Sequence, residues 1–119
     1  MGERKEFELV FVSGRGFVRK ALPPAPEPTP TEAVVRPKYV GICGSDLFLL
    51  ESLGRKTGEL RLGHEWIGVV ERAGKKSKLK RGDVVTSTGT LSCLTCDFCK
   101  RAETHFCSDA EYLSSDSIG

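Results

Sequence analysis

The sequence contains no apolar segment long enough to span a bilayer and no glycine-rich loop of the kind that binds nucleotide phosphates. Its beginning, Met1 to Glu6, is charged, and Glu8 interrupts the short apolar stretch that follows. We therefore expect neither a signal peptide nor a transmembrane helix. The Gly14-x-Gly16 pair lacks the third glycine of a dinucleotide fingerprint, because Arg19 occupies that position. A nucleotide-binding domain is accordingly predicted to be absent from these 119 residues.

The sequence also lacks a strong excess of charge of either sign. Eighteen Lys and Arg residues against sixteen Asp and Glu residues give a net charge of +2. Five of the seven residues from Lys75 to Arg81 are cationic, but no aromatic side chain is interleaved with them for base stacking. We interpret this segment as a solvated turn and expect neither a nucleic-acid partner nor a membrane partner.

The length and the composition predict one mostly β domain. A chain of 119 residues can bury a single modest core. Thirteen glycines and six prolines separate short β-branched runs, as in a chain built mainly of strands. We expect a hairpin from residues 7–12 and 17–22, an extended proline-rich connector over 23–30, and further strands over 33–40, from Gly63 and from Gly82. Pro37 should lie at a sheet edge or at a bulge, because it cannot donate a ladder hydrogen bond.

Four of the five cysteines lie within the segment from Leu91 to Cys107. Two-residue gaps separate Cys93, Cys96 and Cys99, and a seven-residue gap precedes Cys107. Two-residue gaps let neighbouring thiolates turn inward on a tight loop, and the longer gap returns the chain to the fourth corner of a tetrahedron. Four thiolates leave no open position on a zinc ion. The pattern therefore predicts a closed, structural zinc site in a lobe of about residues 91–108.

Two other interpretations of these cysteines remain open. Two disulfides are disfavoured, because Cys-x-x-Cys pairs are too close to bridge comfortably and no export signal is present. An iron–sulfur cluster is the stronger rival, since the first three cysteines match the bacterial ferredoxin run. In that run a three-residue gap leads to a fourth cysteine followed by proline, whereas here the gap is seven residues and Ser108 follows. We favour zinc, and the clustered thiols indicate a reducing, cytoplasmic location.

Two further motifs carry residues capable of chemistry. The run Gly41-Ile42-Cys43-Gly44-Ser45-Asp46 ends a predicted strand and opens a short apolar helix over residues 47–53. Cys43 and Ser45 should therefore lie beside a helix N-terminus, where the backbone dipole favours a thiolate. The run Gly63-His64-Glu65 opens another predicted strand. Taken singly, Cys43 would be a small buried hydrophobe and His64 a core histidine, but with the cysteine lobe they form a set.

In this order, Gly-x-Cys-Gly-Ser-Asp, Gly-His-Glu and the spaced cysteines resemble the zinc-dependent medium-chain alcohol and polyol dehydrogenases, in their N-terminal GroES-like catalytic domain. The resemblance covers about residues 32–107. It implies a partly open GroES-like β-barrel with a four-cysteine zinc lobe and a short helix. The implied parent is a homo-oligomer that oxidises a small alcohol with NAD(P). Similarity of Phe48 and Glu111-Tyr112 to the glucose and polyol branches favours a sugar or polyol substrate.

The resemblance also implies roles for individual residues. Cys43 and His64 would ligate a catalytic zinc, with Glu65 beside it as an alternate ligand. Asp46 would orient the histidine, as metal-bound imidazoles generally require, and Ser45 matches the hydroxyl that takes the proton of the substrate. The zinc would lower the pKa of the substrate hydroxyl so that hydride can leave for the nicotinamide. The spaced cysteines match the structural-zinc lobe of the family.

Three departures from the family pattern are visible. Phe48 replaces a histidine of the proton relay, the third protein ligand of the catalytic zinc normally lies beyond the lobe, and the nucleotide-binding domain is missing. We therefore expect the chain to be the N-terminal portion of a longer enzyme, without dehydrogenase activity by itself. The competing hypothesis is a stand-alone zinc-binding interaction module that catalyses nothing.

Overall fold

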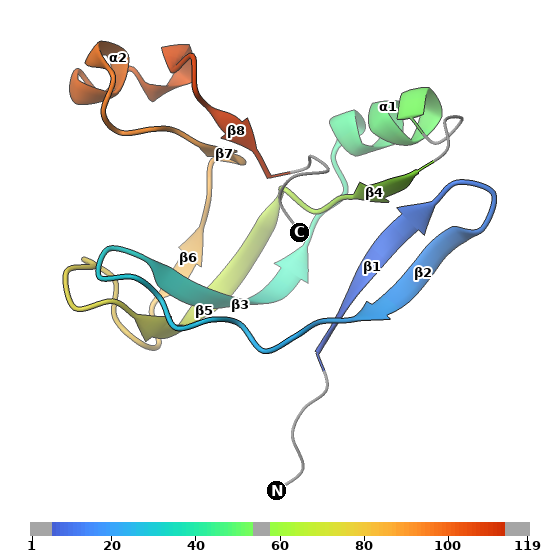
Figure 1. The fold of residues 1–119 in the computed structure, drawn as a ribbon, viewed down its shortest axis with the longest axis horizontal. Coiled ribbons are helices and arrows are strands. Elements are labelled where there is room, and N and C mark those ends of the chain that lie inside the picture. Colours follow the sequence, from blue (N-terminus) through green and yellow to red (C-terminus); the bar gives the residue numbers. More distant parts are fainter. Residues whose placement is uncertain (1–5, 54–57, 114–119) are drawn as a thin grey trace, which may run out of the picture.

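The computed structural model of the protein describes residues 6–53 and 58–113 (Figure 1). The charged beginning, residues 1–5, lies outside the described part.

Strands predominate, which confirms the mostly β class. The first sheet has the order β2-β1-β4, the second β3-β5-β6, and β7 pairs with β8. All of these pairings are antiparallel, and the sheets do not close into a barrel within the described residues, as expected for a partly open fold. The strands are β1 (Phe7–Val12), β2 (Gly16–Ala21), β3 (Ala33–Val40), β4 (Glu59–Arg61), β5 (Trp66–Ala73), β6 (Val84–Thr86), β7 (Thr90–Leu91) and β8 (Glu111–Tyr112).

The predicted N-terminal hairpin is present. β1 and β2 pair from Phe7↔Ala21 to Val12↔Gly16, so β2 lies one residue earlier than predicted. The loop closes with a 3.0 Å hydrogen bond from the Arg15 N–H to the Val12 carbonyl. Gly14 has a φ of 76° and Gly16 one of 77°, and these left-handed conformations explain why glycine occupies both positions.

The proline-rich connector joins the two large sheets. Residues 22–29 form neither helix nor strand, as predicted for an extended segment. The end of the connector lies against the end of β5, where the Gly74 N–H donates to the Glu32 carbonyl and the Lys76 N–H donates to the Pro30 carbonyl. β3, which follows, is an edge strand of its sheet with a register shift between Pro37 and Tyr39. Pro37 is therefore at an edge and at a bulge, and both sequence expectations are met.

The helix α1 (Gly44–Leu53) begins three residues earlier than the predicted start at Leu47. The cause is a local capping interaction, in which the Cys43 N–H donates a 2.9 Å hydrogen bond to Asp46 Oδ2. A carboxylate in the first turn that reaches back to the N–H preceding the helix satisfies a donor that the helix leaves free. The capping carboxylate thus fixes both the helix start and the backbone of Cys43.

The cationic segment forms the exposed loop between β5 and β6. β6 begins at Val84, two residues after the predicted start at Gly82, because the Asp83 N–H still closes the turn by donating to the Lys80 carbonyl. β5 likewise begins at Trp66, three residues after the predicted start at Gly63. Beyond β6 the chain enters a small lobe, built from β7, the short helix α2 (Asp97–Lys100), the 3₁₀ helix η1 (Thr104–Phe106) and β8. Figure 1 shows this lobe, in orange and red, on the opposite side of the molecule from the blue N-terminal hairpin. None of the helices that the structure describes is long and apolar enough to cross a membrane.

The described residues bury few side chains. Val10 and Leu60 are the buried apolar residues of the first sheet, and Val70 is that of the second. Asp46 is the one buried charged side chain in this part of the chain, with an exposed fraction of 2%. Burying a carboxylate is costly unless it is hydrogen-bonded or paired, so its surroundings are informative.

Candidate metal centres

Strand pairing brings the first candidate site together. Val40, at the end of β3, pairs with Trp66, at the start of β5. Just beyond this pair, the Gly41 N–H donates a 2.7 Å hydrogen bond to the Glu65 carbonyl. Cys43 therefore follows the end of one strand and His64 precedes the start of its neighbour, so two residues distant in sequence lie at the same end of one sheet.

The side chains of this first site converge. The ligand atoms of Cys43, His64 and Glu65 all lie within 4.8 Å of one another. Ser45 Oγ lies 3.2 Å from His64 Nε2. A thiolate, an imidazole nitrogen and a carboxylate oxygen are zinc ligands, and catalytic zinc sites use three protein ligands and leave a fourth position for water or substrate. This donor set fits a zinc ion at an open site.

Asp46 supports both principal members of the site. Its Oδ2 accepts the hydrogen bond from the Cys43 N–H, and its Oδ1 lies 3.2 Å from His64 Nδ1. The second contact falls short of hydrogen-bond geometry, which leaves Oδ1 buried without a hydrogen bond. Ligating histidines generally donate their other N–H to a carboxylate or carbonyl, and Asp46 is the carboxylate beside this ring nitrogen.

The second candidate site is the cysteine lobe. The sulfur atoms of its four cysteines also lie within 4.8 Å of one another. Cys93 Sγ and Cys99 Sγ are 3.9 Å apart, close to the edge of about 3.8 Å that Zn–S bonds of about 2.3 Å give a tetrahedron. All five cysteines of the chain are free thiols. This geometry fits one closed four-thiolate zinc site.

Backbone donors surround the sulfur atoms of the lobe. The N–H groups of Thr95 and Cys96 donate to Cys93 Sγ at 3.5 and 3.3 Å, and the Cys99 N–H donates to Cys96 Sγ at 3.5 Å. Hydrogen bonds from the Thr95 side chain and from these N–H groups lower the pKa of Cys93 to about 6. Burial, with the Cys96 thiol beside it, raises the pKa of Cys99 to about 12. Donors directed at sulfur favour the charged thiolate that a metal requires.

The seven predicted metal ligands fall into these two clusters, and the predicted residues Ser45 and Asp46 lie beside the first cluster. Three features were not predicted from the sequence. One is the side chain of Thr95, which lies between two cysteines in sequence and hydrogen-bonds to the Cys93 thiol. The direct backbone bond between Gly41 and Glu65 depends on strand register. Gly89, where an added Cβ would lie 3.7 Å from His64 Cδ2, is 25 residues further along the chain than the histidine. No short sequence pattern indicates either contact.

The fold and the two clusters together define a mostly β domain with one closed and one open candidate metal site. Comparison with protein families places the chain more narrowly, because residues 29–119 match the alcohol dehydrogenase GroES-like domain. The chain belongs to this family. Family membership supports the dehydrogenase interpretation over that of a stand-alone interaction module.

Individual relatives agree with this assignment. The chain is 36% identical over 107 residues to a sorbitol dehydrogenase of Bombyx mori, covering 86% of this chain and 31% of that protein. An alcohol dehydrogenase from Thermus sp. ATN1 superposes with a TM-score of 0.73 at 31% identity, covering 90% of this chain and 31% of the other. A protein described as a zinc-binding dehydrogenase of Sinorhizobium meliloti 1021, bound to NADP, gives a TM-score of 0.71 at 26% identity, covering 95% and 33%. The chain thus spans about a third of the length of these relatives.

Proposed function

We propose that this chain supplies the metal-binding part of the active site of a zinc-dependent, NAD(P)-linked dehydrogenase of alcohols, polyols or sugars. Residues 1–119 would be the N-terminal part of its GroES-like catalytic domain, with the structural-zinc lobe at about 91–108. The observation that carries the proposal is the convergence of Cys43, His64 and Glu65 beside the buried Asp46. A purely structural domain has no need of a second, open ligand set.

Each residue of the open site has a distinct task in this proposal. Asp46 Oδ1, 3.2 Å from His64 Nδ1, favours a proton on that nitrogen and so leaves the Nε2 lone pair free for the metal. Cys43 supplies a thiolate, and its backbone N–H is held by the same carboxylate. Ser45 is exposed in the first turn of α1, so its hydroxyl can take up the proton of a substrate hydroxyl while it passes its own proton to water. Zinc, when bound, supplies Lewis-acid polarisation of the substrate oxygen.

The substrate and the hydride acceptor are supported by the relatives. A sorbitol dehydrogenase among them supports a polyol or sugar substrate, and the relative bound to NADP supports a nicotinamide nucleotide as acceptor. Within these 119 residues no glycine-rich phosphate loop is present, so we propose that the chain alone neither binds the nucleotide nor catalyses hydride transfer. We further propose a cytoplasmic, homo-oligomeric parent enzyme.

Cobalt substitution of the purified chain tests the proposal. Co²⁺ bound to thiolate absorbs strongly in the near ultraviolet, so the lobe is first filled with one equivalent of zinc and cobalt is then titrated. We expect one further equivalent to bind with a thiolate-to-cobalt band. The Cys43→Ser variant should lose that band, and the control Asp109→Asn, at an exposed position outside both ligand sets, should keep it. A zinc-loaded wild-type chain that binds no cobalt would contradict the open site.

A further inference from the structure

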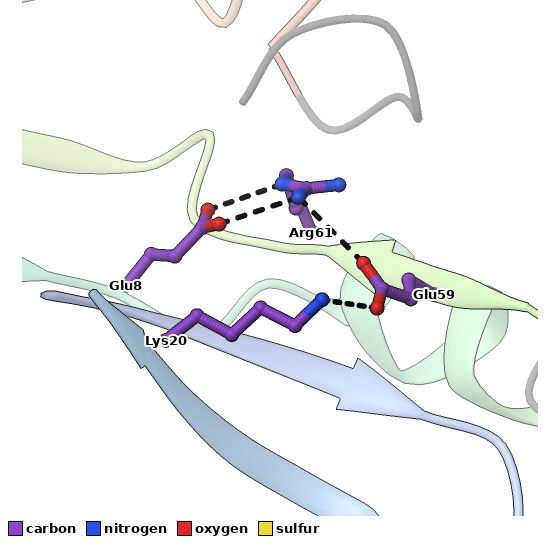
Figure 2. Close-up of polar contacts among 4 residues, drawn as sticks. All are labelled: Glu8, Lys20, Glu59 and Arg61. Carbon is purple, nitrogen blue, oxygen red and sulfur yellow. Dashed lines mark hydrogen bonds and ion pairs between the residues drawn. The ribbon is translucent and has the colours of Figure 1, made fainter. Parts of the chain in front are cut away.

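A forked ion pair ties β4 to β1. Arg61 Nε lies 3.1 Å from Glu8 Oε2, and Arg61 Nη2 lies 3.3 Å from Glu8 Oε1. Figure 2 shows the guanidinium of Arg61 facing the Glu8 carboxylate on one side and the Glu59 carboxylate on the other. The side chains of Arg61 and Glu8 are 26% and 20% exposed. Two parallel bonds fix direction as well as distance, and partial burial limits screening by salt.

The strand that carries Arg61 is short and lies at the edge of the first sheet. β4 is three residues long and, among the described residues, pairs with β1 alone, from Val10↔Arg61 to Val12↔Glu59. Leu60, between Glu59 and Arg61, is buried, with an exposed fraction of 5%. On the outer side, Glu59 is paired with Lys20 of β2 and lies 3.7 Å from Arg61 Nη2. A short edge strand forms few ladder hydrogen bonds. Contacts of its outward-facing side chains therefore determine the direction in which the chain leaves the strand.

His64 lies just beyond that end. Strand pairing stops at Arg61 and resumes at Trp66, so residues 62–65 bridge the two sheets without ladder bonds of their own. The bridge is anchored on the second sheet by the hydrogen bond between Gly41 and Glu65. On the first sheet its anchor is β4. Cys43 is attached to β3 of the second sheet, and His64 lies between the two anchors. The position of His64 relative to Cys43 therefore depends on how β4 is held as well as on the bond between Gly41 and Glu65.

We propose that Arg61, through its fork to Glu8, is a positioning residue for His64. The inference rests on the proposed open metal site of Cys43, His64 and Glu65. The fork fixes the direction in which the chain leaves β4, and Gly63, with a φ of 114°, then turns it towards the site. Without the fork, residues 62–65 can rotate about Gly63. His64 then samples positions in which its Nε2 and the Cys43 thiolate no longer face a common metal position.

The test measures cobalt affinity of the open site in zinc-loaded protein, for the wild type and for Arg61→Met, Glu8→Gln and the double variant. We expect each single variant to weaken cobalt binding by about tenfold, near the lower end of the effect of groups that orient metal ligands. The double variant should be no weaker than Arg61→Met, because both changes remove one interaction. Arg61→Lys, which keeps the charge without the fork, should retain part of the affinity.

The matched control is Lys20→Met, which removes the other cation of the same network at the far end of β4. It should lower thermal stability about as much as Arg61→Met yet leave cobalt affinity within about twofold. A wild type that binds no cobalt overturns the open site itself. Wild-type binding with unchanged affinity in folded Arg61→Met, or in Glu8→Gln if Arg61→Met does not fold, overturns the positioning role. Equal losses in Lys20→Met and Arg61→Met would overturn it as well.

Discussion

The backbone N–H of Gly41 donates a 2.7 Å hydrogen bond to the carbonyl oxygen of Glu65. This bond joins the chain leaving β3 to the chain entering β5, just beyond the last ladder pair, Val40↔Trp66. The residues on either side, Cys43 and His64, are thereby brought to one end of a sheet although the helix α1 and the strand β4 separate them in sequence. The open site is therefore a product of strand register more than of any local loop.

Replacing Gly41 with alanine should disturb the site more than the fold. A Cβ at this position would lie 3.2 Å from Glu65 Oε2, so the flexible carboxylate must move by a few tenths of an ångström. We expect a stability change below about 1 kcal/mol, with cobalt binding at the open site weakened by less than about tenfold. Gly44→Ala is the matched control, since nothing lies within 4 Å of its added Cβ. Equal cobalt affinity in Gly41→Ala and Gly44→Ala would contradict this account of Glu65.

The Asp46→Asn variant should lose metal affinity while keeping its helix. An asparagine oxygen can still accept the hydrogen bond from the Cys43 N–H, but its NH₂ group would then face His64 Nδ1. That arrangement favours a proton on Nε2 and removes the lone pair that a metal needs. Cobalt affinity should fall by about 10- to 100-fold, measured by the thiolate-to-cobalt band. Asp109→Asn, at an exposed position, should leave the affinity unchanged, and a comparable loss there would show that the effect is not specific.

Much of this structure could be predicted from local sequence patterns. The cysteine spacing indicates the lobe because ligands close in sequence must be close in space, and the glycines at 14 and 16 indicate the hairpin. The apolar run predicts too late a start for α1, because one hydrogen bond from the Cys43 N–H to the Asp46 carboxylate extends the helix beyond that run. The strand β4 is too short to show a period. Its fork between Glu8 and Arg61 joins residues 53 positions apart, which no local pattern encodes.

Gly74→Ala should destabilise the whole domain. An added Cβ would lie 2.0 Å from the Thr29 carbonyl oxygen and 2.5 Å from the Pro30 backbone. Backbone atoms cannot yield as a flexible side chain can, so the proline-rich connector must lift from the end of β5. We expect a loss of about 1–3 kcal/mol in the free energy of unfolding, measured by urea denaturation. Gly44→Ala again serves as the control, and equal midpoints for the two variants would show that this docking contributes little.

Acid should weaken the network on β4 in a defined direction. The hydrogen bond from Lys20 lowers the pKa of Glu59 from its ordinary value of 4.5. A carboxyl whose pKa is lower in the folded state stabilises the fold at pH values above 4.5. This contribution is lost as the pH falls through the folded-state pKa. The wild-type melting temperature should therefore fall more steeply below pH 4.5 than that of Glu59→Gln or Lys20→Met. Parallel curves for all three proteins would contradict a native pairing of Glu59 with Lys20.

The two metal sites should release their ions and react in a fixed order. The lobe encloses its ion with four thiolates, three of which receive backbone hydrogen bonds, whereas the open site offers one thiolate and leaves a coordination position for water. A mild chelator should therefore remove the ion of the open site first and leave one zinc per chain, as measured by metal analysis.

Alkylation followed by peptide mapping should then label Cys43 before any lobe cysteine, because Cys43 stands at the N-terminus of α1, where the helix dipole favours the thiolate. The Thr95→Ala variant should keep the same order of metal release and labelling. Its lobe should lose zinc faster than the wild-type lobe, because the hydrogen bonding to Cys93 is weakened. Early labelling of Cys96 or Cys99 would mean that the lobe, and not the Cys43 site, is the open one. A brown protein with thiolate-to-iron absorption would mean that the lobe binds an iron–sulfur cluster and not zinc.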